Sequence, residues 1–157
     1  MKKLFAMILC AALVLSMAAC GSKPAPAPEK KNVDLNALYE SFGASLPEMW
    51  ILDEDMMLNM YGIKAEDCTQ VITAIVSTGL NVDEVWLIEA KDEASLEQLK
   101  TLAESRMKAK ADETIDYLPD QYVFVEKGVI LTEGLYLALI VSPDVDNLKA
   151  AFEAAVK

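Results

Sequence analysis

The segment 135–141 restricts the fold more than any other part of this chain. Its seven residues, LYLALIV, are apolar or aromatic throughout. Because side chains alternate between the two faces of a β-strand, a strand of this composition has to be covered on both sides. We therefore expect a central strand in a layered fold, with helices packed on the sheet.

Three other segments have the composition of strands. Residues 69–78, 82–90 and 123–131 are rich in β-branched and aromatic side chains. The connections 79–81 and 132–134 are short enough for hairpins. Two hairpins joined by a helix predict a mainly antiparallel, four-stranded sheet in an α+β fold with the order ααββαββα. Gly128 indicates either a bulge or a strand that begins only after it.

Helix signals fill the gaps between these strands. Aspartates that can cap a helix precede apolar residues at helical spacing, and glycines suited to helix ends follow two of these segments. Pro143 suits the first position of the last helix. The expected caps are Asp34, Asp53, Asp92 and Ser142, with Gly43 and Gly62 as helix ends and the longest helix over residues 93 to about 111. Between the first two helices, we expect Trp50 and Ile51 to tuck under the sheet.

The first 20 residues indicate export. Lys2 and Lys3 precede the uncharged run LFAMILCAALVLSM, which is shorter than the roughly 20 residues of a membrane span and typical of a signal peptide. The following MAACGS resembles the bacterial lipobox, although Met17 stands where leucine is more usual. It predicts cleavage before Cys20 and a diacylglyceryl anchor, with fatty chains such as palmitate, on the Cys20 thiol. The alternative is an ordinary signal peptide in which Cys20 is incidental.

The chain then divides into three parts. Residues 1–19 are the predicted signal peptide, residues 20–32 the lipidated cysteine and a Pro-rich tether, and residues 33–157 a single α+β domain. The tether's PAPAP could also be a docking ligand, but a spacer suits its place beside an anchor. We expect the domain on the extracytoplasmic face of the cell membrane, held through the anchor on Cys20.

Charge and cysteine content narrow the possible partners. Loss of residues 1–19 leaves 12 basic and 25 acidic side chains, a formal charge of −13. Such a surface repels phosphate backbones and anionic headgroups, so nucleic acid is not an expected partner.

Cys68 would be the one cysteine left in the domain, which excludes an internal disulfide. We interpret it as a small apolar residue that begins a strand, with a reactive thiol as the alternative.

The chain lacks the side chain most often used in general acid–base catalysis. It contains no histidine, which removes the common general base and zinc ligand. We expect no cofactor, no metal and no catalytic residue, although acids at positions 53–55, 83–84 and 112–116 leave acid–base chemistry open. We interpret these acids as solvated, since charge runs are normally exposed.

Methionine and aromatic residues gather between positions 49 and 61. Met49, Trp50, Met57 and Tyr61 could bind an apolar ligand or a partner helix. The alternative is that they fill the core under the first two helices.

Several short segments carry a family resemblance. The stretches VDLNALYESF, LPEM, DMMLNMYGI, VWLIEAKDEASLEQLK and YLPDQY resemble bacterial lipoproteins of the domain of unknown function 4358, over roughly residues 33–157. The resemblance implies a membrane-anchored, extracytoplasmic protein without disulfides. It implies no activity and no functional residue.

Three functions remain open. The favoured hypothesis is a non-catalytic, lipid-anchored binding or assembly module that recognises an envelope protein or peptide. The alternative is a carboxylate-dependent hydrolase or metal-assisted enzyme of the cell surface, which requires acids that converge in a cleft. A solute receptor is the third, but one domain of this size lacks the usual two lobes.

Overall fold

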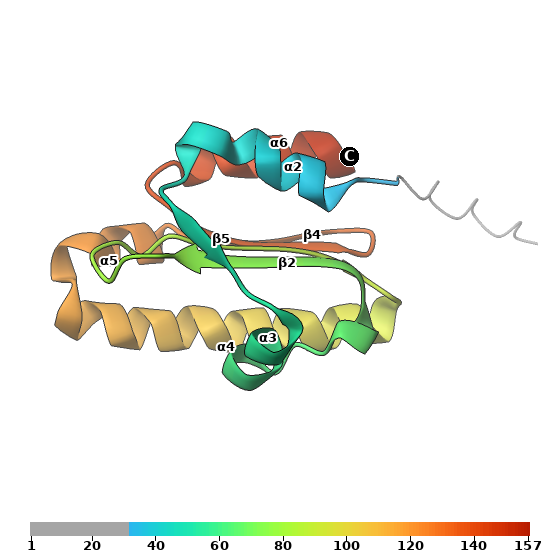
Figure 1. Ribbon diagram of the computed structural model, residues 1–157, viewed down its shortest axis with the longest axis horizontal. Coiled ribbons are helices and arrows are strands. Elements are labelled where there is room, and N and C mark those ends of the chain that lie inside the picture. The colour runs from blue at the N-terminus through green and yellow to red at the C-terminus, as the bar shows by residue number, and fades with distance from the viewer. Residues whose placement is uncertain (1–31) are drawn as a thin grey trace, which may run out of the picture.

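The computed structural model describes residues 32–157 as a sheet with helices on both faces (Figure 1). The predicted signal peptide, Cys20 and nearly all of the predicted tether lie outside the described residues. Within residues 32–157, no helix combines the length and the apolar character needed to cross a membrane. In chain order, the helices and strands are α2 (Leu35–Phe42), β1 (Met49–Ile51), α3 (Glu54–Tyr61), β2 (Cys68–Val76), β3 (Glu84–Ala90), α4 (Glu93–Tyr117), α5 (Pro119–Glu126), β4 (Val129–Glu133), β5 (Tyr136–Val141) and α6 (Val145–Val156), with short 3-10 turns at Gly43–Ser45 and Ala65–Asp67.

The strands form one antiparallel sheet in the order β1-β2-β3-β5-β4. Helices α2 and α6 lie side by side on one face, and α4 lies along the other (Figure 1). This arrangement confirms the α+β class and the antiparallel hairpins expected from the sequence. It also confirms that the apolar segment 135–141 forms an inner strand, because every residue of β5 is buried between β3 and β4.

Two hydrophobic cores follow from this layering. Val85 and Leu87 of β3 face the core under α2 and α6, whereas Trp86 and Ile88 face the core under α4. The alternation of neighbouring residues between the cores is the period-2 pattern of a strand. Strand β3 is therefore buried along its whole length, as β5 is.

The expected aspartate caps are present. Asp34 accepts hydrogen bonds from the amides of Asn36 and Ala37 at 2.9 and 3.1 Å. Asp53 accepts one from Met56, and Asp92 accepts one from Ser95. Each bond satisfies an amide that the first helical turn would leave unpaired.

One helix end agrees with expectation and two others differ in detail. Gly62 ends α3 with φ 76°, the left-handed conformation expected there. Helix α4 continues to Tyr117, beyond the expected end near residue 111. The predictions of Ser142 as the cap and Pro143 as the first residue of the last helix were wrong, because α6 begins at Val145 with Asp144 at the cap position. The Ser142 hydroxyl instead accepts a hydrogen bond from the Asp144 amide in the turn before the helix.

The prediction of four strands was wrong, because β1 adds a fifth. Trp50 pairs with Ile75 and Ile51 with Ala74, so this segment forms an edge strand instead of tucking under the sheet. The side chains of Trp50 and Ile51 are 52% and 54% exposed. Three residues are too few to show an alternating pattern, and their pairing depends on a strand more than 20 residues away.

The prediction of a strand over residues 123–131 was also wrong in its first half. Residues Pro119–Glu126 form helix α5, and β4 begins only at Val129, so the strand starts after Gly128 and no bulge forms there. The β-branched composition of this segment is overridden by packing, since Val125 is buried in the core under α4. Pro119 stands in the first turn, where the missing amide hydrogen costs no hydrogen bond.

Candidate functional site

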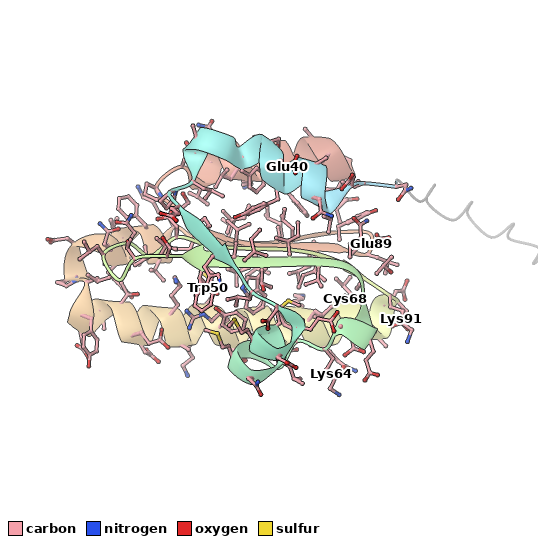
Figure 2. All side chains as sticks on the ribbon, in the orientation of Figure 1. Glu40, Trp50, Lys64, Cys68, Glu89 and Lys91 are labelled. Carbon is pink, nitrogen blue, oxygen red and sulfur yellow. The ribbon has the colours of Figure 1, made fainter. Side chains whose placement is uncertain are left out.

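The four residues expected to bind a ligand lie in different environments. Met57 of α3 is buried in the core under α4, and Met49 is half-buried on the edge strand. Trp50 is the middle residue of β1, is 52% exposed and lies on the α4 side of the sheet (Figure 2). Tyr61 ends α3 and packs its ring 4.8 Å from the ring of Trp86. Of the two interpretations of this region, core filling describes Met57, whereas Trp50 remains available at the surface.

The most unusual group of the described residues is the buried carboxylate of Glu84, which we expected to be solvated. Glu84 begins β3 and faces α4 with no exposed side-chain surface. Arg106 reaches it through Nε and Nη2, the latter 2.9 Å from Oε2, and Lys110 Nζ lies 2.8 Å from the same oxygen. The Trp86 indole donates to Oε1 at 3.0 Å. Four donor groups from three side chains therefore surround one carboxylate.

Helix geometry explains how both cations reach one acid. Arg106 and Lys110 are four residues apart on α4, so their side chains leave the same face of the helix. That face is the buried one, because Ala103 and Thr114 on the same stripe are also buried. The Lys110 stem is covered by protein while its ammonium group meets Glu84.

The electrostatics of this charge cluster (Glu84, Arg106 and Lys110) follow from burial and pairing. Burial alone would raise the pKa of Glu84, but the Arg106 and Lys110 charges outweigh it and the pKa is lowered. Burial would lower the pKa of Arg106, yet the bonds to Glu84 outweigh that effect and raise it. Both side chains are thus held in their charged forms, which is the arrangement that makes a buried ion pair tolerable.

Two further side chains complete the outer side of the cluster. Glu113 accepts from Arg106 Nη1 at 3.2 Å but is itself 63% exposed. The Arg106 guanidinium carbon lies 5.3 Å from the centre of the Tyr61 ring, within cation–π distance. Burial and then the Glu84 charge raise the pKa of Tyr61. Tyr61 Oη, Thr73 Oγ1 and Asp83 Oδ1 are buried without a hydrogen-bond partner among the described residues.

The sequence held one signal for this cluster. The buried stripe of the long helix, which includes Leu99 and Ala103, continues on the same face to Lys110. A lysine at a core position requires a buried acid nearby, and Glu84, one of two glutamates in the strand Glu84–Ala90, is such an acid. The pairing itself joins residues 26 apart in the chain, so only the fold reveals it.

The remaining acids are arranged differently. Asp53, Glu54 and Asp55 are exposed at the start of α3, and Asp112 and Asp116 are exposed on α4, as expected. Asp83 is buried, which contradicts its interpretation as solvated, and burial raises its pKa. Among residues 32–157, no three acid or cysteine side chains come together in a way that could hold a metal ion.

Cys68 begins β2, as expected from the sequence. It is a free thiol, half-buried, whose sulfur lies 3.6 Å from the carbonyl oxygen of Lys64. Burial and then the neighbouring Asp67 raise the pKa of the Cys68 thiol to about 11. A thiol with so little thiolate at neutral pH is a poor nucleophile, which favours the structural interpretation.

A shallow hollow of about 350 Å³ lies where the described chain begins, and Asn32, Val33, Asp34 and Gln70 line it. Gln70 Nε2 donates to the Val33 carbonyl and to Glu89 Oε2, both at 2.8 Å. The Gln70 side-chain oxygen accepts from the Leu35 amide at 3.1 Å. These bonds fasten the first described residues to the sheet, so the lining serves a structural purpose.

Comparison with known protein families gives one match. The family described as domain of unknown function (DUF4358) matches residues 43–142. The chain belongs to this family. No curated protein and no solved structure matches it.

The matched region has a structural meaning. It contains all five strands, α3, α4 and α5, and therefore the whole DUF4358 sheet together with the charge cluster and β1. Helices α2 and α6, which cover the face of the sheet opposite α4, lie outside the matched region. The charge cluster and the edge strand thus both belong to the family region.

Proposed function

We propose that this protein is a lipid-anchored, extracytoplasmic lipoprotein whose DUF4358 domain binds another component of the cell envelope without catalysis. The anchor is proposed on Cys20, from the lipobox-like MAACGS that follows a short apolar run. The proposed arrangement is a signal peptide over residues 1–19, a tether over residues 20–32 and one domain over residues 33–157.

The observation that carries the binding role is the exposed edge of the sheet. Strand β1 presents Trp50 and Ile51 with more than half of each residue's surface accessible, whereas the inner strands β3 and β5 are fully buried. Tryptophan is enriched among the residues that dominate binding energy at protein interfaces. An edge strand also offers backbone groups that another chain can pair with.

The hydrolase alternative receives less support from the same structure. Glu84 is committed to Arg106 and Lys110 beneath α4, so it is not free to exchange a proton with a substrate. The acids of α3 and the α4 residues Asp112 and Asp116 are exposed, and Glu113, which shares Arg106 with Glu84, is bound to that arginine. General acid–base catalysis needs two groups aimed at one reacting bond.

The anchor is tested on the full-length protein expressed in a bacterium that processes lipoproteins. We expect the wild-type chain to partition into detergent and to carry a lipid mass on a new amino terminus at Cys20. The substitution Cys20→Ala should leave an uncut precursor or release the protein from the membrane. An unmodified amino terminus downstream of Cys20 would exclude the anchor.

The binding role is tested by photo-crosslinking in intact cells. A photoreactive phenylalanine analogue at Trp50 is compared with the same analogue at Tyr117, which is 86% exposed at the end of α4. We expect a discrete crosslinked product from position 50 and none of the same mass from position 117. Identical product patterns from both positions, or none from position 50, would contradict the proposal.

A further inference from the structure

The backbone of β1 has a free side. The Leu52 amide donates to the Thr73 carbonyl at 2.9 Å, and the Ser77 amide donates to the Glu48 carbonyl at 3.0 Å. Because hydrogen bonding alternates along an antiparallel pair, Trp50 shares its bonds with β2. The amides and carbonyls of Met49 and Ile51 therefore point away from the sheet. They form an open edge to which one short strand can be added.

The side chains on this edge suit an extended partner. Trp50 and Ile51 lie on opposite faces of β1, since they are neighbours in a strand. Their exposed fractions of 52% and 54% leave an apolar surface on each side of the open backbone. A strand paired with β1 would place its side chains alternately on the two faces, next to Trp50 on one face and next to Ile51 on the other.

The chain segment that contains β1 carries charge of one sign. Residues 32–63 contain six acids and neither lysine nor arginine. Four of these acids flank the strand directly and all four are exposed, namely Glu48 on one side and Asp53, Glu54 and Asp55 on the other. A second copy of this chain would bring like charges together at both ends of the pairing, which disfavours self-association. Lysine or arginine in a partner would instead be attracted there.

We propose that β1 is the docking edge for an extended, positively charged segment of another envelope protein, which adds as a strand beside Met49–Ile51. The segment carries a short β-branched or aromatic core against Trp50 and Ile51, with lysine or arginine on both sides facing Glu48 and the acids at the start of α3. This inference deepens the proposed binding function and rests on it. It names the surface, the backbone groups and the charge of the partner.

The test uses the full-length protein in detergent micelles and two synthetic peptides with the same Val-Thr-Val-Tyr-Val core. One peptide has two lysines at each end and the other has two glutamates. We expect only the lysine peptide to bind in a fluorescence-anisotropy titration. Its affinity should fall at least tenfold when salt rises from about 0.1 M to about 1 M, because the Debye length shrinks from about 10 Å to about 3 Å.

Charge variants separate a local site from general attraction to an acidic protein. The triple variant Glu48→Gln, Glu54→Gln, Asp55→Asn removes three of the four acidic charges that flank β1 and keeps the Asp53 cap. Its matched control, Glu97→Gln, Glu104→Gln, Asp112→Asn, removes the same charge from exposed positions on α4. We expect the flank variant to weaken binding of the lysine peptide at least fivefold and the control to change it less than twofold. Equal losses would overturn the proposal.

Backbone pairing is tested at Ile51. The substitution Ile51→Pro removes an outward amide, a change that edge strands tolerate, and Ile51→Val keeps that amide. We expect the proline variant to lose binding at least tenfold and the valine variant to retain it within twofold, with unchanged circular dichroism for both. In the wild type, the lysine peptide should slow hydrogen exchange of the Met49 and Ile51 amides. Retained binding by Ile51→Pro would refute strand addition, and so would unprotected amides at both positions.

The outcomes for the two proposals are distinguishable. A crosslinked partner at Trp50 without lysine-peptide binding would leave the binding function in place and refute cationic strand addition. In that case the acids beside β1 serve only to protect the edge from pairing. A dimer joined through β1 in sedimentation experiments would also refute the proposed occupant.

Discussion

The sharpest test of the charge cluster is the substitution Glu84→Gln. Glutamine keeps the volume of the side chain, so no cavity forms, but the charge that balances Arg106 and Lys110 is lost. Both cations then lie against a neutral amide, with the Lys110 ammonium originally 2.8 Å from the carboxylate. Removal of one partner from a buried ion pair costs about 3–5 kcal/mol. This is a large share of the about 5–15 kcal/mol that stabilises a typical domain.

The measurement is urea denaturation followed by far-ultraviolet circular dichroism. With a urea dependence of about 1–3 kcal/mol per molar, we expect the unfolding midpoint to fall by about 2 M. Glu113→Gln is the matched control, because Glu113 contacts the same arginine from an exposed position. The substitution Glu113→Gln should lower the free energy of unfolding by less than about 1 kcal/mol, the usual limit for exposed ion pairs.

The effect of Glu84→Gln should also depend on pH. The pKa of Glu84 is lowered in the folded chain, so its ionic contribution is fully present above the unfolded value of about 4.3. That contribution is lost as pH falls through the folded pKa. The difference in the free energy of unfolding between the wild type and Glu84→Gln should therefore become smaller as the pH falls from 7. A difference below about 1 kcal/mol at pH 7, or one that does not change with pH, would refute this account of the cluster.

Two other predictions concern packing and reactivity. Gly128→Ala would place a new Cβ 2.6 Å from Met107 Cε and 2.9 Å from Val141 Cγ2. We therefore expect the free energy of unfolding, measured by urea denaturation, to fall by about 1–3 kcal/mol. Gly79→Ala, where nothing lies within 4 Å, is the control, and equal effects of the two substitutions would contradict the packing argument. Because the pKa of the Cys68 thiol is about 11, iodoacetamide at pH 8 should alkylate it at least about tenfold more slowly in the folded chain than in urea. Peptide mass mapping follows the reaction at Cys68, and similar rates in the two states would show that the thiol is ordinary.

Much of the local structure could be predicted because its signals lie close together in the chain. Asp34, Asp53 and Asp92 cap helices through amides two or three residues away. Segment 135–141 indicated an inner strand because a strand without charged or amide side chains has no face for water. Together with the hairpin-length connections, these features were enough for the α+β class and the antiparallel sheet.

The errors arose where tertiary packing outweighed local preference. Helix α5 forms although its sequence contains Val123, Phe124 and Val125, because Pro119 begins a helical turn and Val125 fills the core under α4. Strand β1 is too short to be recognised alone and exists through its pairing with β2. Of the expected ligand residues, Met57 of α3 is buried in the core under α4, whereas Trp50 lies on the edge strand β1 and is exposed, and this division follows from the packing of α3 and the pairing of β1.

The caps, the inner strand, the acidity of residues 32–63 and the lack of histidine follow from the amino-acid sequence alone, because each is a property of composition or of neighbours in the chain. The contacts of Glu84 with Arg106 and Lys110, and the place of Trp50 on an open edge, follow only from the fold. Both depend on the register between strands and on the placement of α4. These contacts join residues some 20 or more positions apart, and the free energy that selects them comes from burial across the whole sheet.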